Sequence, residues 1–158
     1  MTDFFNKTDL SRNDAEKIIS ETLNNCDDGE LYLENSKSES IVLDDDKIKS
    51  STYSSDLGYG LRAVTGEVVA YSHSNEISRN SLKQSADNLS STLKSRKGVY
   101  NHEIPKTNEK FYKNINPIEE KSLQSKLELL KEVNNYTRAK GGIVQQVTAS
   151  FSGEHKSI

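Results

Sequence analysis

The chain has 158 residues, of which 32% are hydrophobic and 28% charged, and its formal net charge is -3. This length suits one domain with a modest core, and the interspersed acids and bases exclude the clustered basic footprint of a nucleic-acid-binding protein. No apolar run approaches the roughly 20 residues of a membrane span, which argues against a membrane protein.

The N-terminus lacks the basic-then-apolar order of a secretory signal, so we expect a cytoplasmic protein. Cys26 is the one cysteine of the chain, which excludes an internal disulfide framework. It stands among Asn and Asp residues, and neighbouring acids disfavour a thiolate. We therefore interpret Cys26 as an incidental residue near a helix end rather than as a nucleophile.

Residues 1–10 are expected to form a loose lead, after which Ser11 and Asp14 have the S-x-x-D spacing of a helix N-terminus. An apolar stripe at helical spacing follows, and the poor helix formers of 24–29 predict the helix end. The members of the stripe are Ala15, Ile18, Ile19 and Leu23.

The period then changes to two, and we predict two consecutive β-hairpins over residues 30–71. Residues 31–34 alternate and are followed by a polar break at 35–38, and the first hairpin then turns at Asp45–Asp46, pairing Asp44 with Lys47 and Leu43 with Ile48. This register places Leu43 and Ile48 on one half-buried face. A metal site at the acidic turn is the alternative, but adjacent carboxylates diverge and a further ligand at suitable spacing is missing.

The second hairpin is predicted to turn at Thr65–Gly66, which places Ala63 opposite Val68 and Leu61 opposite Ala70. A helix is predicted over 78–95, with a stripe narrow enough for one sheet face. The stripe consists of Leu82, Ala86, Leu89 and Leu93.

Residues 98–116 are expected to form a long loop, followed by a helix over 117–137 with Asn116 as its cap and Pro117 in its first turn. Its predicted apolar stripe is Leu123, Leu127, Leu130 and Val133. The segment 143–158 is expected to be a terminal strand that lacks its partner, with Val147, Ala149 and Phe151 on one face. These elements predict a single α+β domain over 1–158, in which about three amphipathic helices cover one face of an antiparallel sheet.

The sequence offers no catalytic constellation. His102–Glu103 begins an H-E pair, but Lys106 and Thr107 stand where a second histidine of a zinc motif would be needed. The candidate residues are therefore binding groups, and we expect Tyr53, Tyr59, Arg62 and Tyr71 to face a peptide or partner. The alternative for Arg62 is simple exposure on the polar face of the sheet, opposite Leu61.

The order of these elements resembles the N-terminal domain of the TldD/PmbA (TldE) family. The resemblance rests on the acidic-turn strand pair (40–49), the Gly-x-Gly-hydrophobic-Arg strand (58–62) and a helix that opens with Ile77–Ser78. The family was first described as modulators of DNA gyrase and later as microcin-processing zinc metallopeptidases. The chain looks closer to the TldD branch.

The resemblance implies a truncated, non-catalytic N-terminal part of a metallopeptidase subunit, because the family's HExxxH zinc motif is missing here. It implies zinc only in a C-terminal domain, a heterodimer with a PmbA/TldE-like subunit, and unfolded peptide as substrate. We expect the present domain to form a wall of the substrate channel and to supply dimer contacts. The alternative is a stand-alone protein- or peptide-binding module that uses an exposed sheet.

Overall fold

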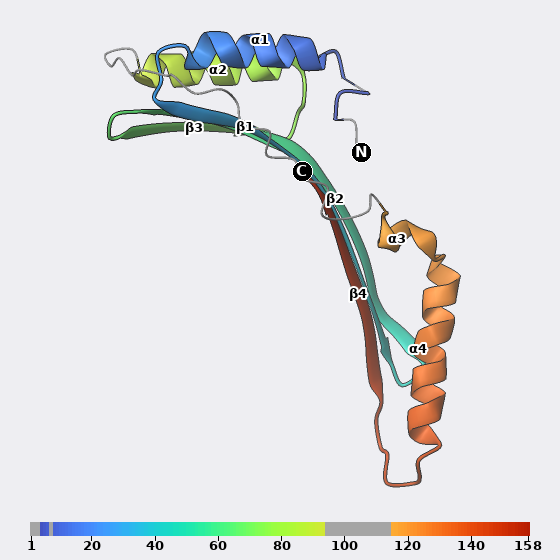
Figure 1. The fold of residues 1–158 in the computed structure, drawn as a ribbon. Helices are drawn as coiled ribbons and strands as arrows, with labels where there is room; N and C mark the ends of the chain where they lie inside the picture. The colour runs from blue at the N-terminus through green and yellow to red at the C-terminus, as the bar shows by residue number, and fades with distance from the viewer. Residues whose placement is uncertain (1–3, 7, 94–114) are drawn as a thin grey trace. The chain divides into compact units, whose positions relative to one another are not determined.

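The computed structural model describes residues 4–6, 8–93 and 115–158. Its four strands form one sheet in the order β3-β2-β1-β4 (Figure 1). The predicted α+β class, an antiparallel sheet with helices, is confirmed. In chain order the elements are α1 (Arg12–Leu23), β1 (Asp28–Asp44), β2 (Lys47–Thr65), β3 (Val68–Ser74), α2 (Arg79–Leu93), α3 (Pro117–Glu120), α4 (Leu123–Arg138) and β4 (Thr148–Ser157).

The described residues fall into two compact units, each with its own apolar core. Unit 1 holds the residues up to 35, residues 56–93 and Ile158, and unit 2 holds 36–55 and 115–157. Strands β1 and β2 contribute residues to both units. None of the described helices is long and apolar enough to cross a membrane.

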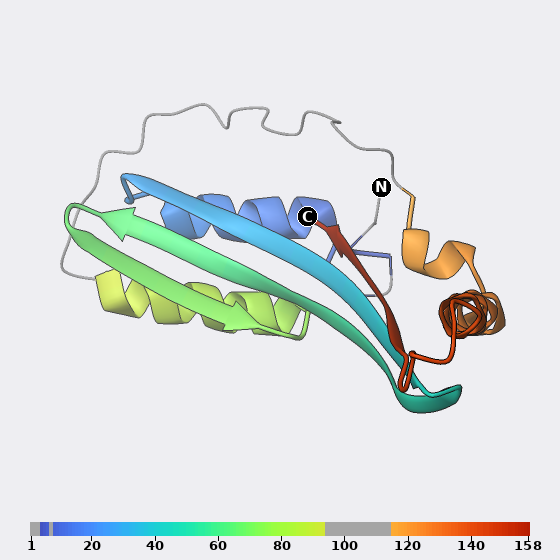
Figure 2. The same cartoon turned by 90° about the horizontal axis from the view of Figure 1, so that it is seen from below.

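In unit 1, α1 and α2 pack on each other and lie side by side along the strands (Figure 2). The predicted cap of α1 is confirmed, since Ser11 Oγ accepts the Asp14 N–H at 3.1 Å and donates to Asp14 Oδ2 at 2.7 Å. The predicted stripe of α2 is confirmed as well, because all four of its residues are buried. In the lead before α1, Leu10 belongs to the same core.

The two predicted consecutive hairpins are present, and they share β2, so that β1, β2 and β3 form a meander of continuous strands. The supposed polar break at 35–38 lies inside β1. Lys37 of this stretch pairs with Glu119, and the next helix-facing residue, Glu39, pairs with Lys126. Ion pairs with residues far along the chain thus stabilise as a strand a polar stretch whose local sequence is typical of a loop.

The turn between β1 and β2 forms at Asp45–Asp46 as predicted, with φ values of 47° and 62°. Two positive φ values are the requirement of a type I′ hairpin turn, and Asp tolerates them better than most residues. Its flanking residues differ from the expectation, since Leu43 is buried whereas Ile48 is 54% exposed.

The turn between β2 and β3 lies at Gly66–Glu67, not at Thr65–Gly66, and Gly66 supplies a φ of 59°. Thr65 therefore pairs with Val68, Ala63 with Ala70 and Leu61 with Ser72. The register differs from the predicted one by two residues. Because the side-chain period of a strand is also two, every residue keeps its predicted face.

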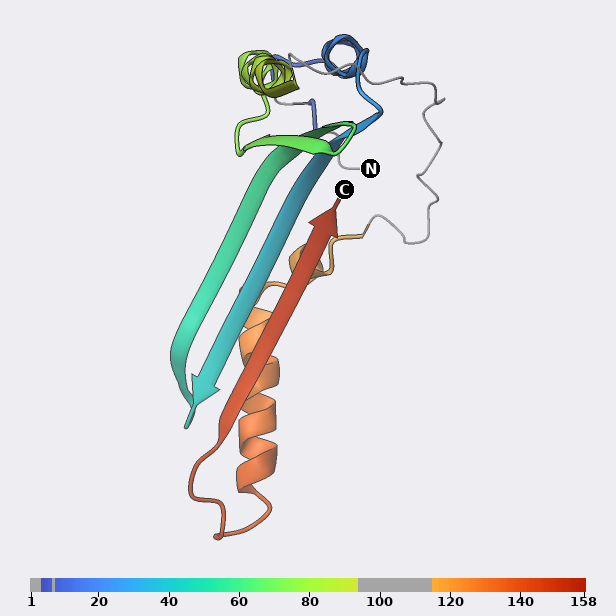
Figure 3. The same ribbon diagram turned by 90° about the vertical axis from the view of Figure 1, so that its left-hand side faces the viewer.

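In unit 2, α3 and α4 pack against β4, and Figure 3 shows α4 running along the strands. The core joins Ile41 and Leu43 of β1 to Leu130 of α4 and Ala149 of β4. Residues 143–147, expected to begin the last strand, precede β4. Val147 and Ala149 are nevertheless buried and Phe151 is half-buried, as their alternation predicts.

The helix predicted over 117–137 is in fact two helices. Asn116 caps α3 as expected, but Lys121 is extended and Ser122 starts α4 by accepting the Ser125 N–H at 3.2 Å. The predicted stripe is also displaced, since Leu123 and Val133 are exposed. The residues of α4 that are buried are Lys126, Leu130 and Asn134. Residues 98–114 of the predicted long loop, which include His102, lie outside the described part of the chain.

Candidate functional site

Arg62 is held by two carboxylates on the sheet face opposite α1 and α2, here called the outer face. Its Nη2 lies 2.7 Å from Asp28 Oδ2 and its Nε 2.8 Å from Glu30 Oε1. The hydrogen bonds that Arg62 donates to Glu30 and then to Asp28 raise the pKa of Arg62 above its usual range. Leu61, the preceding residue, is fully buried on the other face. Arg62 is thus a fixed cation whose charge is already offset on this face.

Tyr71 is the cross-strand partner of Arg62 and is 64% exposed on the outer face. Its ring stacks on His73, with 5.8 Å between the ring centroids. The ring also lies across Gly60, where a Cβ atom would stand 2.6 Å from Tyr71 Oη. Gly60 therefore allows a close approach of the Tyr71 ring to the backbone, which agrees with the usual reason for a glycine inside a strand.

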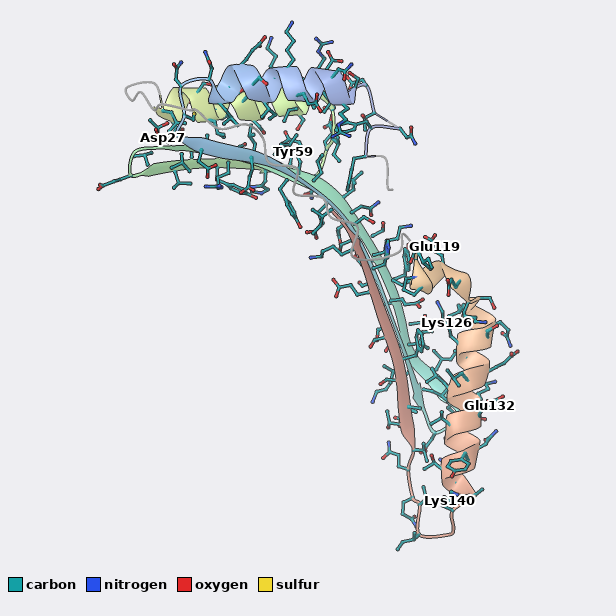
Figure 4. All side chains as sticks on the ribbon, viewed as in Figure 1. Asp27, Tyr59, Glu119, Lys126, Glu132 and Lys140 are labelled. Atoms are coloured by element: carbon teal, nitrogen blue, oxygen red, sulfur yellow. The ribbon has the colours of Figure 1, made fainter. Side chains whose placement is uncertain are left out.

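Tyr59 lies on the opposite face and is only 5% exposed, between β2 and the two helices of unit 1 (Figure 4). Its Oη lies 2.9 Å from the hydroxyl oxygens of both Ser81 and Ser85 on α2. Ser85 in turn accepts from the Ser72 hydroxyl at 3.0 Å. The Tyr59 side chain therefore fixes α2 on the sheet and is not grouped with Arg62 and Tyr71.

Tyr53, the fourth candidate residue, is exposed on the part of β2 that belongs to unit 2. Of the four candidates, then, the structure brings only the side chains of Arg62 and Tyr71 together on the outer face.

A shallow recess of about 230 Å³ adjoins Tyr71 in unit 1. Its main polar residues, Tyr32, Glu34 and Asp56, were not among those predicted from the sequence. Alternation with the core-facing Leu31 and Leu33 was the signal that could have placed the first two on the outer face. The recess is lined by Tyr32, Glu34, Asp56, Leu57, Gly58, Tyr59, Gly60, Tyr71, Ser74 and Asn75.

Tyr32 and Glu34 are joined within this recess. The Tyr32 hydroxyl donates to Glu34 Oε2 at 2.5 Å. This hydrogen bond is the main reason that the pKa of Tyr32 is raised, because the carboxylate favours the protonated phenol.

Unit 2 holds a buried ion pair that the sequence did not predict. Lys126 Nζ donates to Glu39 Oε1 at 2.5 Å and to the Ile118 carbonyl at 2.7 Å, and it lies 5.6 Å from the Phe151 ring centroid. Figure 4 shows Lys126 on the side of α4 that faces the strands. The pair ties α3 and α4 to β1 and has a structural role.

A second hollow, of about 420 Å³, lies between α4 and β4 in unit 2. Leu129, Leu130 and Val133 line it from the helix, and residues 146–151 line it from the strand side. None of the four predicted site residues takes part in it.

The carboxylates of the acidic turn interact with other side chains of the same chain. Asp44 Oδ1 accepts from Gln146 at 2.9 Å and from Thr148 at 2.8 Å, and these bonds, helped by Lys49, lower the pKa of Asp44. Asp45 pairs with Arg138. In the part of the chain that the structure describes, no three His, Cys, Asp or Glu side chains are grouped as metal ligands. The acidic turn therefore gives no support to the alternative of a metal site.

The sequence of the chain is similar to a known protein family and to several of its members. Residues 29–93 match the family described as PmbA/TldA metallopeptidase domain 1. The chain is 35% identical over 133 residues to the metalloprotease TldD homolog of Buchnera aphidicola (from Acyrthosiphon pisum), covering 84% of this chain and 28% of the relative. It is 32% identical over 140 residues to the metalloprotease TldD homolog of Haemophilus influenzae, covering 85% and 28%.

Two solved structures share the fold. One is a Bacteroides thetaiotaomicron protein assigned as a modulator of DNA gyrase, with a TM-score of 0.56 and 20% identity over 92% of this chain and 38% of that one. The other is TldE from Thermococcus kodakarensis, with a TM-score of 0.56 and 13% identity over 89% of this chain and 32% of that one. The chain thus spans between a quarter and two fifths of the length of these proteins.

Proposed function

We propose that the chain is the non-catalytic N-terminal part of a TldD-like zinc metallopeptidase subunit, since residues 29–93 match the first domain of the PmbA/TldA metallopeptidases. The match of this stretch, together with the similarity to two TldD homologs over most of the chain, carries the proposal. Zinc and the catalytic groups then belong to a C-terminal domain, and the working protein processes peptides in the cytoplasm.

In this proposal the outer face of unit 1 forms a wall of the substrate channel. Arg62 and Tyr71 stand side by side on it, and Tyr71 presents a largely exposed ring. Strands β3 and β4 are the two edges of the sheet, and a sheet edge can bind an extended peptide through main-chain hydrogen bonds with little sequence preference. Binding through main-chain hydrogen bonds does not select particular side chains, so it suits an unfolded polypeptide of any sequence.

The partner in the proposal is a PmbA/TldE-like subunit. Exposed apolar side chains on α4 support a protein contact there, and they lie at helical spacing along one side of the helix. These side chains are Leu129, Val133 and Tyr136. Co-purification with the TldE-like protein of the same genome tests this contact, and Val133→Lys should weaken it while Lys131→Glu on α4 should not.

Site-directed photo-cross-linking tests the peptide-facing role. Tyr71→p-benzoylphenylalanine in the full chain should cross-link to peptides of a peptic albumin digest, because residue 71 lies on the outer face. The matched control is Glu21→p-benzoylphenylalanine on the exposed side of α1, which should give only background. Equal yields at the two positions would refute the peptide-facing role.

Zinc titration by calorimetry tests the non-catalytic assignment separately. The purified chain should show no stoichiometric heat of binding, and a tight one-to-one zinc site would overturn the assignment. Peptide cross-linking at residue 71 together with a failure to co-purify with the TldE-like protein would instead favour the stand-alone binding module.

A further inference from the structure

We propose that the edge of β4 and the adjoining hollow beside α4 bind a second copy of this chain, so that two β4 strands pair antiparallel across a two-fold axis. β4 is the last strand of the sheet, and Figure 3 shows it at the border of the strands. The inference rests on this edge and on the hollow of about 420 Å³ in unit 2, and it does not depend on the peptidase assignment.

The free side of β4 offers main-chain hydrogen bonds. The Val147 carbonyl accepts the Asp45 N–H at 2.9 Å and is therefore directed toward the end of β1. Successive residues of a strand direct their N–H and C=O groups to opposite sides, so those of Thr148, Ser150 and Ser152 are directed away from β1. In the part of the chain that the structure describes, no further strand lies beyond β4 in this sheet, so these groups form an open edge.

This edge lacks the charges that commonly protect an open strand. Residues 141–153 contain no Asp, Glu, Lys or Arg. In β2, by contrast, the stretch 47–58, which β3 does not cover, begins with Lys47 and Lys49. Natural sheets place charges, lysine above all, on exposed edges because a strand added there would bury them. The uncharged edge of β4 therefore favours pairing with another strand.

An apolar groove lies along the same edge. The hollow is lined by α4, including Leu129 and Val133, and by residues 146–151, and among the described residues none of β1 lines it. Leu129 and Val133 are 48% and 44% exposed, so these side chains are not enclosed by the core of unit 2. A strand added to β4 would lie beside them and cover their apolar surface. The hydrogen-bonding edge and the apolar groove thus fit one and the same added strand.

A second β4 has the side chains that this place requires. With the two-fold axis at Ser150, Phe151 of one copy stands opposite Ala149 of the other on the face that α4 covers, so a large side chain meets a small one. Glu154 stands opposite Gln146 of the other copy, so the acid does not meet a like charge. Because each copy offers the same patch to the other, the contact closes as a dimer.

The dimer uses part of the α4 surface that the proposed function assigns to a PmbA/TldE-like subunit. Leu129 and Val133 belong to both contacts. The two associations therefore exclude each other, and the homodimer is the state of the chain without that subunit.

Cysteine cross-linking of the full chain tests the register. Ser150→Cys places the two thiols directly opposite each other across the axis, so a short bismaleimide should convert most of the protein into a covalent dimer. Ser152→Cys is the matched control, because the same pairing offsets its two copies by four residues, about 14 Å. The wild-type chain gives the background, since Cys26 is only 3% exposed. Equal cross-linking at positions 150 and 152 would overturn the two-fold register.

Sedimentation equilibrium tests the groove. The wild-type chain should show a monomer–dimer equilibrium, and Leu129→Glu should raise its Kd at least about tenfold, because the variant brings two carboxylates to the paired strands. Leu123→Glu makes the same change at a similarly exposed position of α4 that does not line the hollow, and it should leave the Kd unchanged. Circular dichroism establishes that each variant is folded.

Three results of these measurements would overturn the inference: a wild-type chain that stays monomeric, one that associates beyond the dimer, or a Kd that is the same for Leu129→Glu and wild type. The last would show that the groove lies outside the interface. None of them bears on the proposed function, whose tests by cross-linking at residue 71 and by co-purification do not require self-association.

Discussion

Lys126 and Glu39 form an ion pair of 2.5 Å although their side chains are only 5% and 11% exposed. The two residues stand on α4 and β1 and are separated by 87 positions in the sequence. A buried charge without its partner is strongly unfavourable, so the charge of each residue offsets the desolvation cost of the other in the core of unit 2.

Removing one charge of this pair should lower the free energy of unfolding far more than replacing both residues with apolar ones. Lys126→Met leaves Glu39 buried alone, and we expect a loss of about 3–5 kcal/mol in the free energy of unfolding. The double variant Lys126→Met with Glu39→Leu should recover most of that loss, because no charge remains to be buried. Urea denaturation followed by circular dichroism measures both. A double variant no more stable than the single one would show that the pair itself is required.

The Asp44 carboxylate should make stability depend on pH at the acid end. Hydrogen bonds from Gln146 and Thr148 lower its pKa in the folded state, so its contribution is complete above about pH 4 and is lost as the pH falls through the lowered value. Asp44→Asn should therefore be less stable than wild type at pH 7, and the difference should shrink toward pH 3.

The urea midpoints of the two proteins across this range measure the effect. Asp46→Asn is the matched control, since it removes the same charge two positions away in the same turn. A difference between wild type and Asp44→Asn that is unchanged from pH 7 to pH 3 would contradict the assignment.

Gly60→Ala should displace the Tyr71 ring, because the added Cβ would stand 2.6 Å from Tyr71 Oη. The obstacle is the far end of a side chain, so the protein should fold and lose about 1 kcal/mol of stability. The ¹H–¹⁵N spectrum should change around residues 71 and 73. Gly142→Ala, where nothing lies within 4 Å of the added atom, should leave stability and spectrum nearly unchanged. Identical spectra for Gly60→Ala and wild type would disprove the contact.

The edge strand β4 should promote self-association, since its outer side presents backbone groups to a second chain. Sedimentation velocity over a range of concentrations should show oligomers of the chain. Ser150→Lys places a charge on an exposed position of β4 and should reduce them, whereas Ser90→Lys on α2 should not. A monomer at every concentration would rule this prediction out.

Local signals account for the elements that the sequence predicted well. The Ser11 cap, the stripe of α2 and the turn at Asp45–Asp46 each depend on residues within a few positions of one another. The faces of Arg62 and Tyr71 follow from strand alternation, which is why they survived a register that was wrong by two residues. The same alternation puts Tyr59 with Leu61 in the core, where the structure finds it.

What the sequence determined by itself was thus the class of fold, the family resemblance and the face on which each strand residue lies. The tertiary structure alone decided that the polar stretch of β1 is strand, since Lys37 and Glu39 find Glu119 and Lys126 only after the chain folds back. It alone brought Tyr32, Glu34, Asp56 and Tyr71 into one recess. Such juxtapositions join residues tens of positions apart, and no local period or cap encodes a contact at that distance.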